Sequence, residues 1–143
     1  GSPLSKELVT GALITFDCEF FLSYGMTECC GKISMSLLDQ PTIRSLAPHQ
    51  QLELISTSDR PFHPIKVRLM AEGLMAEGCN VPLAGIGAQG EVQIRGPTVF
   101  AEYHHNEDAT KEAFTSDGWF RTSNVARQEV YGYLTVCDRL KDT

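Results

Sequence analysis

Gly90-Glu91-Val92-Gln93-Ile94-Arg95-Gly96-Pro97 is the stretch that says most about the fold. Charged or amide side chains alternate with apolar ones from Glu91 to Arg95, which predicts a strand with one buried and one solvated face. Gly96-Pro97 predicts the end of that strand, because proline has no N–H to donate to a β-ladder. Ile65-Lys66-Val67-Arg68-Leu69 has the same alternation and predicts a second strand upstream.

The β-rich pattern continues downstream and includes one helix. Asn106 is a suitable N-cap for a short helix over 107–114, and Asp117-Gly118 predicts a turn. Two further strands are expected over 125–130 and 133–137, joined by a turn between them. This half of the chain is therefore expected to be a small, mostly antiparallel β region.

The first part of the chain has a different pattern. Apolar residues recur at helical spacing over residues 1–16, with Ser5 as a plausible N-cap. Phe20-Phe21-Leu22 then predicts a short buried strand that leads into a tight turn at Tyr24-Gly25. Such strand ends are where open α/β sheets hold ligands. Four prolines between 39 and 64 predict loops and short helix.

Composition excludes several classes of protein. The chain has 143 residues, of which 42% are hydrophobic, and a formal net charge of −6. The apolar fraction can fill a core, and an acidic chain without a basic cluster is not expected to bind nucleic acid. The longest apolar stretch, 8–16, is shorter than the ~20 residues of a membrane span. Five cysteines without a CxxC spacing predict reduced thiols in an intracellular protein. This pattern does not distinguish the cytoplasm from a peroxisome.

Four segments, in order along the chain, carry a family resemblance. They are Gly1-Ser2-Pro3-Leu4-Ser5, Tyr24-Gly25-Met26-Thr27-Glu28, residues 90–97, and Asp117-Gly118-Trp119-Phe120-Arg121-Thr122 continuing through Gly132-Tyr133-Leu134 to Asp138-Arg139-Leu140-Lys141-Asp142. Together they resemble the adenylate-forming (AMP-binding) superfamily, and most closely its acyl-CoA synthetases and 4-coumarate–CoA ligases. An unrelated β-rich binding module would need all four matches to be coincidental.

The resemblance implies both a fold and a reaction. It implies an α/β partial domain with three parts: the end of an α/β nucleotide-binding subdomain (1–58), a small β-barrel-like subdomain (59–137), and a hinge (138–143) toward a C-terminal domain. The family activates a carboxylic acid with ATP and Mg²⁺ to an acyl-adenylate and, as an acid–thiol ligase, transfers the acyl group to CoA. Its phosphate loop and catalytic lysine have no counterpart in the chain, so the isolated chain is expected to be inactive.

The resemblance also implies roles for the first two segments. The backbone of Gly1-Ser2-Pro3 and the ring of Tyr24 would flank the adenine, and Gly25 and Met26 would complete that nucleotide-binding turn. Thr27 would place its hydroxyl near the α-phosphate, and Glu28 would bind Mg²⁺, which prefers oxygen ligands; these two are the catalytic candidates. Taken without the family, Thr27 and Glu28 equally suit helix capping and a solvated carboxylate.

The last segment would supply the ribose contacts and the hinge. Arg139 would reach the ribose or the phosphates, and Asp138 and Lys141 would form the hinge. Asn124 stands where the family has an aspartate that grips both ribose hydroxyls, and an amide offers one acceptor oxygen where a carboxylate offers two. Glu102 and Asp59 replace customary glycines. These departures keep open the alternative of a non-catalytic remnant with weak nucleotide binding or none.

Overall fold

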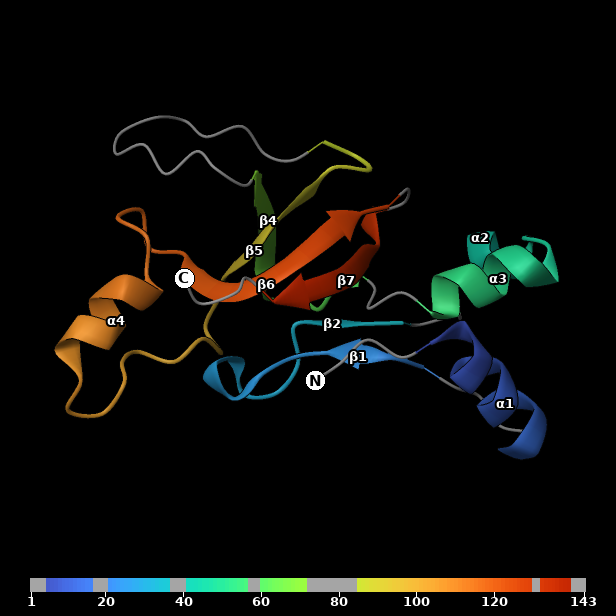
Figure 1. Cartoon of the computed structure of the whole chain (residues 1–143), viewed down its shortest axis with the longest axis horizontal. Helices are drawn as coiled ribbons and strands as arrows, with labels where there is room; N and C mark the ends of the chain where they lie inside the picture. Colours follow the sequence, from blue (N-terminus) through green and yellow to red (C-terminus); the bar gives the residue numbers. More distant parts are fainter. Residues whose placement is uncertain are drawn as a thin grey trace.

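The computed structural model describes residues 5–16, 21–36, 41–56, 60–71, 85–129 and 132–139. It contains two antiparallel sheets (Figure 1). A small sheet has the order β1-β2-β3, and a larger sheet has the order β4-β5-β6-β7. The strands are β1 (Ser23–Tyr24), β2 (Ser34–Met35), β3 (Arg60–Pro61), β4 (Lys66–Ala71), β5 (Gln89–Arg95), β6 (Phe120–Gln128) and β7 (Leu134–Arg139).

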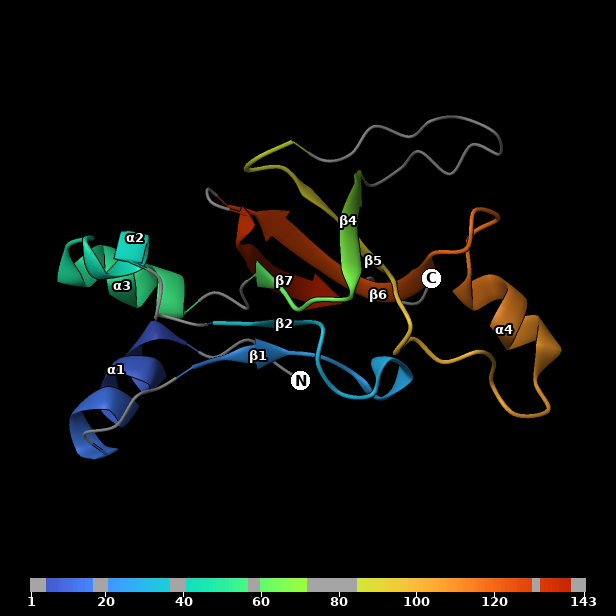
Figure 2. The same ribbon diagram turned by 180° about the vertical axis from the view of Figure 1, so that it is seen from behind.

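The larger sheet confirms the expected β region, although it is open. In the described residues each strand pairs with its neighbour in the chain, and β4 and β7 form the two edges, so no barrel is closed. The sheet is strongly twisted (Figure 2), as antiparallel sheets of this length are. Val92 and Ile94 on β5 are completely buried, as their alternation predicts.

Two polar features of this sheet differ from the sequence pattern. Gln93 is buried on the face expected to be solvated, because its amide lies between Arg68 Nε (2.9 Å) and Glu91 Oε2 (2.9 Å). Strand β6 begins at Phe120, five residues earlier than predicted. Its first part contains Thr122 and Asn124, which are buried although they are polar, because their side chains are hydrogen-bonded inside the protein. Polar residues with internal partners do not follow an in–out hydrophobic pattern.

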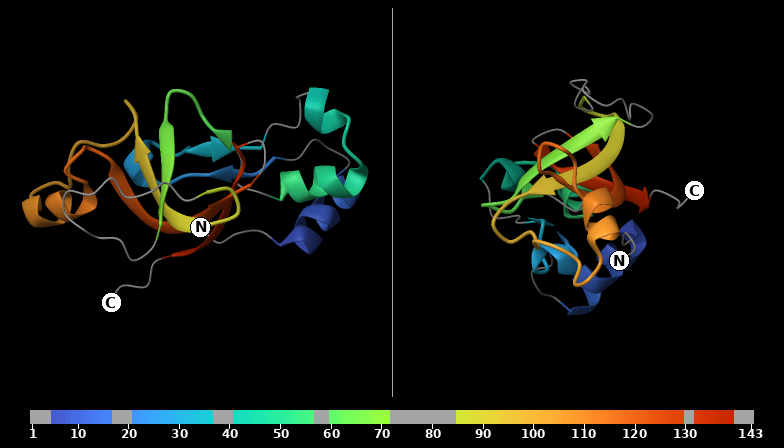
Figure 3. Two further views of the ribbon diagram at one scale, coloured as in Figure 1. Left: turned by 90° about the horizontal axis from the view of Figure 1, so that it is seen from above. Right: turned by 90° about the vertical axis from the view of Figure 1, so that its left-hand side faces the viewer.

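The helices lie at the two ends of the molecule, with the sheets between them (Figures 1 and 3). At one end are α1 (Lys6–Phe16), α2 (Pro41–Arg44) and α3 (Pro48–Ile55), and at the other is α4 (Glu107–Ala113). Both predicted N-caps are confirmed, since the Ser5 hydroxyl accepts from Leu8 N (3.3 Å) and Asn106 Oδ1 from Ala109 N (3.1 Å). None of the described helices combines the length and apolar character needed to cross a membrane.

The first part of the chain required two corrections. The expected buried strand at 20–22 is wrong for Phe21, which precedes β1 and is 52% exposed; Phe20 lies outside the described residues. The predicted apolar face of α1 is only partly covered, because Val9 is buried while Phe16 is 70% exposed.

One core joins the two sheets. The β1–β2 hairpin packs against the larger sheet (Figure 3), with Cys29 and Ile33 from the hairpin meeting Val92, Ile94 and Phe120 from the larger sheet. Burial of this shared apolar surface places the tip of the hairpin beside β6 and β7.

Candidate functional site

The tip of the β1–β2 hairpin is built around Gly25. A Cβ at this position would overlap the carbonyl oxygen of Gly31 and lie 2.9 Å from Lys32 Cα, so only glycine fits. The return of the chain is closed by Gly31 N, which donates to Met26 O at 3.0 Å, and by Ile33 N, which donates to Tyr24 O at 2.8 Å.

The tip itself is a short 3₁₀ helix, Thr27–Cys29. It follows Met26 and ends at Cys30, whose backbone is left-handed (φ 56°). Thr27 is exposed, whereas Glu28 is half-buried. The two catalytic candidates therefore lie on one short turn, with Thr27 exposed to solvent.

Two hydrogen bonds from one later segment hold Glu28. Phe100 N donates to the Glu28 carbonyl oxygen at 2.7 Å, and the Tyr103 hydroxyl donates to Glu28 Oε1 at 3.1 Å. Burial, and then the hydrogen bond to this carboxylate, raise the pKa of Tyr103, so its hydroxyl stays a donor at neutral pH. Among the described residues no other side chain hydrogen-bonds this carboxylate, which leaves Oε2 able to accept another ligand.

Tyr24 packs against the core of the larger sheet, close to Thr122 and Asn124 on β6. Burial is the main cause that raises the pKa of its phenol, and the Thr122 and Asn124 side chains and the Arg139 guanidinium act in the other direction. Its hydroxyl is buried and makes no hydrogen bond of acceptable geometry with any described residue. The structure thus brings Tyr24, Asn124 and Arg139 together, although they are distant in the sequence.

The strand pairing explains this meeting. Asn124 on β6 pairs directly with Arg139 on β7. Ser123 has a left-handed backbone (φ 55°), and the neighbouring Asn124 side chain folds back so that Nδ2 donates to Thr122 O at 2.9 Å. The Thr122 hydroxyl donates in turn to Val92 O at 2.7 Å and accepts from Asn124 N at 3.2 Å. The amide nitrogen of Asn124 is therefore hydrogen-bonded inside the protein, and the residue as a whole is buried.

Several predicted residues cannot be placed. Gly1, Ser2 and Pro3 lie outside the described residues, and so does Lys141. The backbone of Asp138 belongs to β7 and pairs with Val125. The predicted adenine wall from the first residues and the hinge roles therefore stay predictions.

Sequence reasoning missed Tyr103 and Thr122. Tyr103 meets Glu28 across 75 positions of sequence, and no periodicity or spacing signals such a contact. Thr122 belongs to the segment Asp117–Thr122 that carries the family resemblance, but its buried hydrogen bond to the β5 backbone has no local sequence signature.

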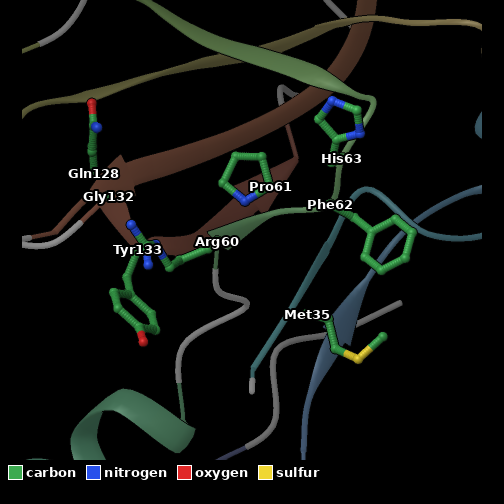
Figure 4. Close-up of a pocket in the computed structure, with 8 residues that line it drawn as sticks. All are labelled: Met35, Arg60, Pro61, Phe62, His63, Gln128, Gly132 and Tyr133. Carbon is green, nitrogen blue, oxygen red and sulfur yellow. The ribbon is translucent and has the colours of Figure 1, made fainter. Parts of the chain in front are cut away.

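A cavity of about 570 Å³ opens elsewhere, between the small sheet and the β6–β7 turn (Figure 4). It is lined by Met35, Arg60, Pro61, Phe62, His63, Gln128, Gly132 and Tyr133. None of the predicted site residues lines it, so the candidate site is the hairpin tip and not this cavity.

Residues 1–104 match the family model of the AMP-binding enzyme. The chain belongs to the AMP-binding enzyme family. Among the curated members of this family, a long-chain-fatty-acid–CoA ligase of Thermus thermophilus is 36% identical over 83% of the chain and 21% of its own length. A nonribosomal peptide synthetase of Aspergillus ustus is 41% identical over 84% of the chain and 12% of its own length. The chain thus spans about a fifth or less of these family members.

Solved structures of the AMP-binding family agree with this fold. The o-succinylbenzoate coenzyme A synthetase of Bacillus subtilis in complex with AMP superimposes with a TM-score of 0.73 at 25% identity, over 99% of this chain and 25% of that one. The same enzyme in complex with ATP and magnesium ion also has a TM-score of 0.73, at 25% identity and over 99% of this chain and 26% of that one. The α/β partial domain is therefore the fold shared with these family members.

Proposed function

We propose that the chain is part of an AMP-forming acyl-CoA synthetase, an enzyme that activates a fatty or aryl carboxylic acid with ATP and transfers it to CoA. The observation that supports this most is the meeting of Tyr24, Asn124 and Arg139 beside the turn that carries Glu28. These are side chains that the resemblance assigns to the nucleotide, and they come from three separate strands, β1, β6 and β7. The proposal includes the division of the chain into a nucleotide-binding part (1–58), a β-rich subdomain (59–137) and a hinge (138–143). It also includes an intracellular location.

The residues present fit a nucleotide. The buried Tyr24 hydroxyl has no hydrogen-bond partner among the described residues, and a buried polar group of this kind is stabilised when a ligand bonds it. The tyrosine ring offers a flat apolar face for a base. Asn124 would accept from a ribose hydroxyl through its oxygen, and Arg139, which is exposed, would contact ribose or phosphate oxygens. Gly25 and Met26 would supply a backbone surface without an obstructing Cβ.

The residues present also fit Mg²⁺. Glu28 offers a half-buried carboxylate with one oxygen already oriented, and Mg²⁺ is commonly held by one or two carboxylates together with substrate phosphates. Bound there, the ion would neutralise phosphate charge. The exposed Thr27 hydroxyl, one residue earlier on the same turn, would donate to an α-phosphate oxygen.

The acceptor of the acyl group is the finer part of the proposal. The Tyr24–Glu28 motif and the compact 96–100 segment favour CoA ligases. The fatty-acid–CoA ligase and a 2-succinylbenzoate–CoA ligase of Bacillus licheniformis, 32% identical over 84% of the chain, support that preference. The peptide synthetase shares more identity, so thioester formation with CoA must be measured directly.

The test uses the full-length protein that contains this chain. It is incubated with ATP, Mg²⁺, CoA and a panel of fatty and aryl acids, and pyrophosphate release and acyl-CoA are measured. We expect acid-dependent pyrophosphate release and a thioester, and neither product from the isolated 143 residues. Release by the isolated chain would contradict the proposal that it is an inactive part, and release without thioester would contradict CoA as acceptor.

One observation favours a non-catalytic remnant. The Asn124 amide donates to Thr122 O and offers a ligand one neutral oxygen, where a carboxylate would offer a charged pair. A titration of ATP with Mg²⁺ into the full-length protein separates the two functions. Micromolar binding with turnover excludes the remnant, whereas absent binding excludes the synthetase.

A further inference from the structure

The Glu28 carboxylate is held by the segment that follows β5. Phe100 N donates to the main-chain carbonyl oxygen of Glu28 at 2.7 Å, and the Tyr103 hydroxyl donates to the Glu28 side-chain Oε1 at 3.1 Å. Main chain and side chain of one glutamate are thus restrained from the same short segment. A free glutamate side chain has several rotamers, and a second contact at its end removes most of them.

Tyr103 is itself anchored on both sides. Its backbone N donates to Thr110 Oγ1 at 3.0 Å, and its carbonyl oxygen accepts from Asn106 N at 3.1 Å, so the start of α4 fixes its main chain. Its ring packs edge-on against Phe100, with centroids 4.7 Å apart, and the Phe100 ring also contacts Phe120 in the core at 5.2 Å. The hydroxyl therefore reaches Glu28 from a rigid support.

We propose that Tyr103 is a positioning residue that orients the Glu28 carboxylate for a divalent cation, with Oε1 bound to the tyrosine hydroxyl and Oε2 presented to the metal. This inference rests on the proposed function, which places Mg²⁺ at Glu28. Preorganised ligands bind a metal more tightly than mobile ones, and such outer contacts typically change metal affinity by about 10–100-fold. Tyr103 need not touch the metal or the nucleotide for this effect.

Tyr103→Phe tests the proposal in the full-length protein, because it removes the hydroxyl and keeps the ring against Phe100. Mn²⁺ serves as the probe ion, and its binding in the presence of ATP without acid is followed by electron paramagnetic resonance, independently of turnover. We expect about a tenfold weaker Mn²⁺ affinity. ATP affinity without metal and the urea midpoint of the protein should stay within error, which a merely structural role would not produce.

Three variants make the outcome decisive. Thr135→Val is the matched control, since it also removes a hydroxyl bond to a carboxylate (Thr135 Oγ1 to Glu129 Oε1, 3.2 Å), and its Mn²⁺ affinity should equal the wild-type value. Thr110→Val removes the hydrogen bond that holds the Tyr103 main chain, and it should weaken Mn²⁺ binding less than Tyr103→Phe does. If Tyr103→Phe unfolds, Thr110→Val tests the positioning role in its place. Glu28→Gln should abolish the Mn²⁺ site.

The results distinguish the two proposals. If the wild-type protein binds no Mn²⁺ with ATP, or if Glu28→Gln binds it unchanged, the metal role of Glu28 in the proposed function is wrong and the positioning role falls with it. If Glu28→Gln loses Mn²⁺ but Tyr103→Phe and Thr110→Val bind it as the wild type does, the metal site stands and the positioning role of Tyr103 is overturned.

Discussion

Gly25→Ala should unfold the hairpin tip, and Gly11→Ala is its matched control. At position 25 the new methyl group would meet backbone on both sides, namely the Gly31 carbonyl oxygen and Lys32 Cα. At position 11, on α1, it would have no atom within 4 Å. The same chemical change is therefore predicted to have opposite effects at the two sites.

The magnitude follows from these contacts. The milder overlap, 2.9 Å to Lys32 Cα, is about 0.6 Å shorter than the ~3.5 Å at which two carbon atoms rest. Overpacking of a tight site costs about 1–3 kcal/mol and occasionally more. The displaced return strand would also lose the Gly31–Met26 and Ile33–Tyr24 bonds, at about 0.5–1.5 kcal/mol each. We expect Gly25→Ala to lower the free energy of unfolding by about 3–5 kcal/mol. Alanine in a helix is favoured over glycine by about 0.5–1 kcal/mol, so Gly11→Ala should raise the free energy of unfolding by about that amount.

Urea unfolding of the 143-residue chain measures both effects, with circular dichroism and the fluorescence of the single Trp119 as two probes. In the full-length protein, Gly25→Ala should also abolish ATP binding, because Tyr24 and Glu28 flank the turn. The reasoning would be refuted if Gly25→Ala unfolded within about 0.5 kcal/mol of the wild type, the scatter expected of an ordinary surface substitution.

Three further predictions concern the larger sheet. Ile94→Ala should lower the free energy of unfolding by about 2–5 kcal/mol, because it leaves a cavity at a fully buried position; the urea midpoint checks this. The Arg68 guanidinium, hydrogen-bonded at 2.7 Å, holds the pKa of Asp117 well below its ordinary 3.8. The stability that comes from this depressed pKa is complete at neutral pH and is lost progressively as the pH falls below about 4 toward the folded pKa. The difference in urea midpoint between the wild type and Asp117→Asn should therefore narrow as the pH falls from 7 to 2. Asn124→Asp should strengthen ATP binding by the full-length protein roughly tenfold through charge-assisted bonding and weaken the fold by about 1–3 kcal/mol through the lost bond to Thr122 O; calorimetry and urea unfolding measure the two effects.

The parts of the fold that the sequence predicted correctly depend on neighbours in the chain. Alternation over Glu91–Arg95 predicts β5, and Asn106 predicts the start of α4, because both are decided within a few residues. The parts that it predicted wrongly depend on distant partners. Phe21 was expected in a buried strand, but it precedes β1, which pairs with β2 in an antiparallel hairpin and not with the strands of a covered parallel sheet.

The candidate site divides in the same way. The motif at Tyr24–Glu28 is contiguous, so the sequence alone supplied its residues and, through Gly25, the need for a turn without a Cβ. That Tyr24 meets Asn124 and Arg139 depends on the packing of the hairpin against the larger sheet and on the pairing of β6 with β7. The contact of Tyr103 with Glu28 depends on that packing too, because burial of a shared apolar core selects which distant side chains meet, and no local pattern encodes that choice.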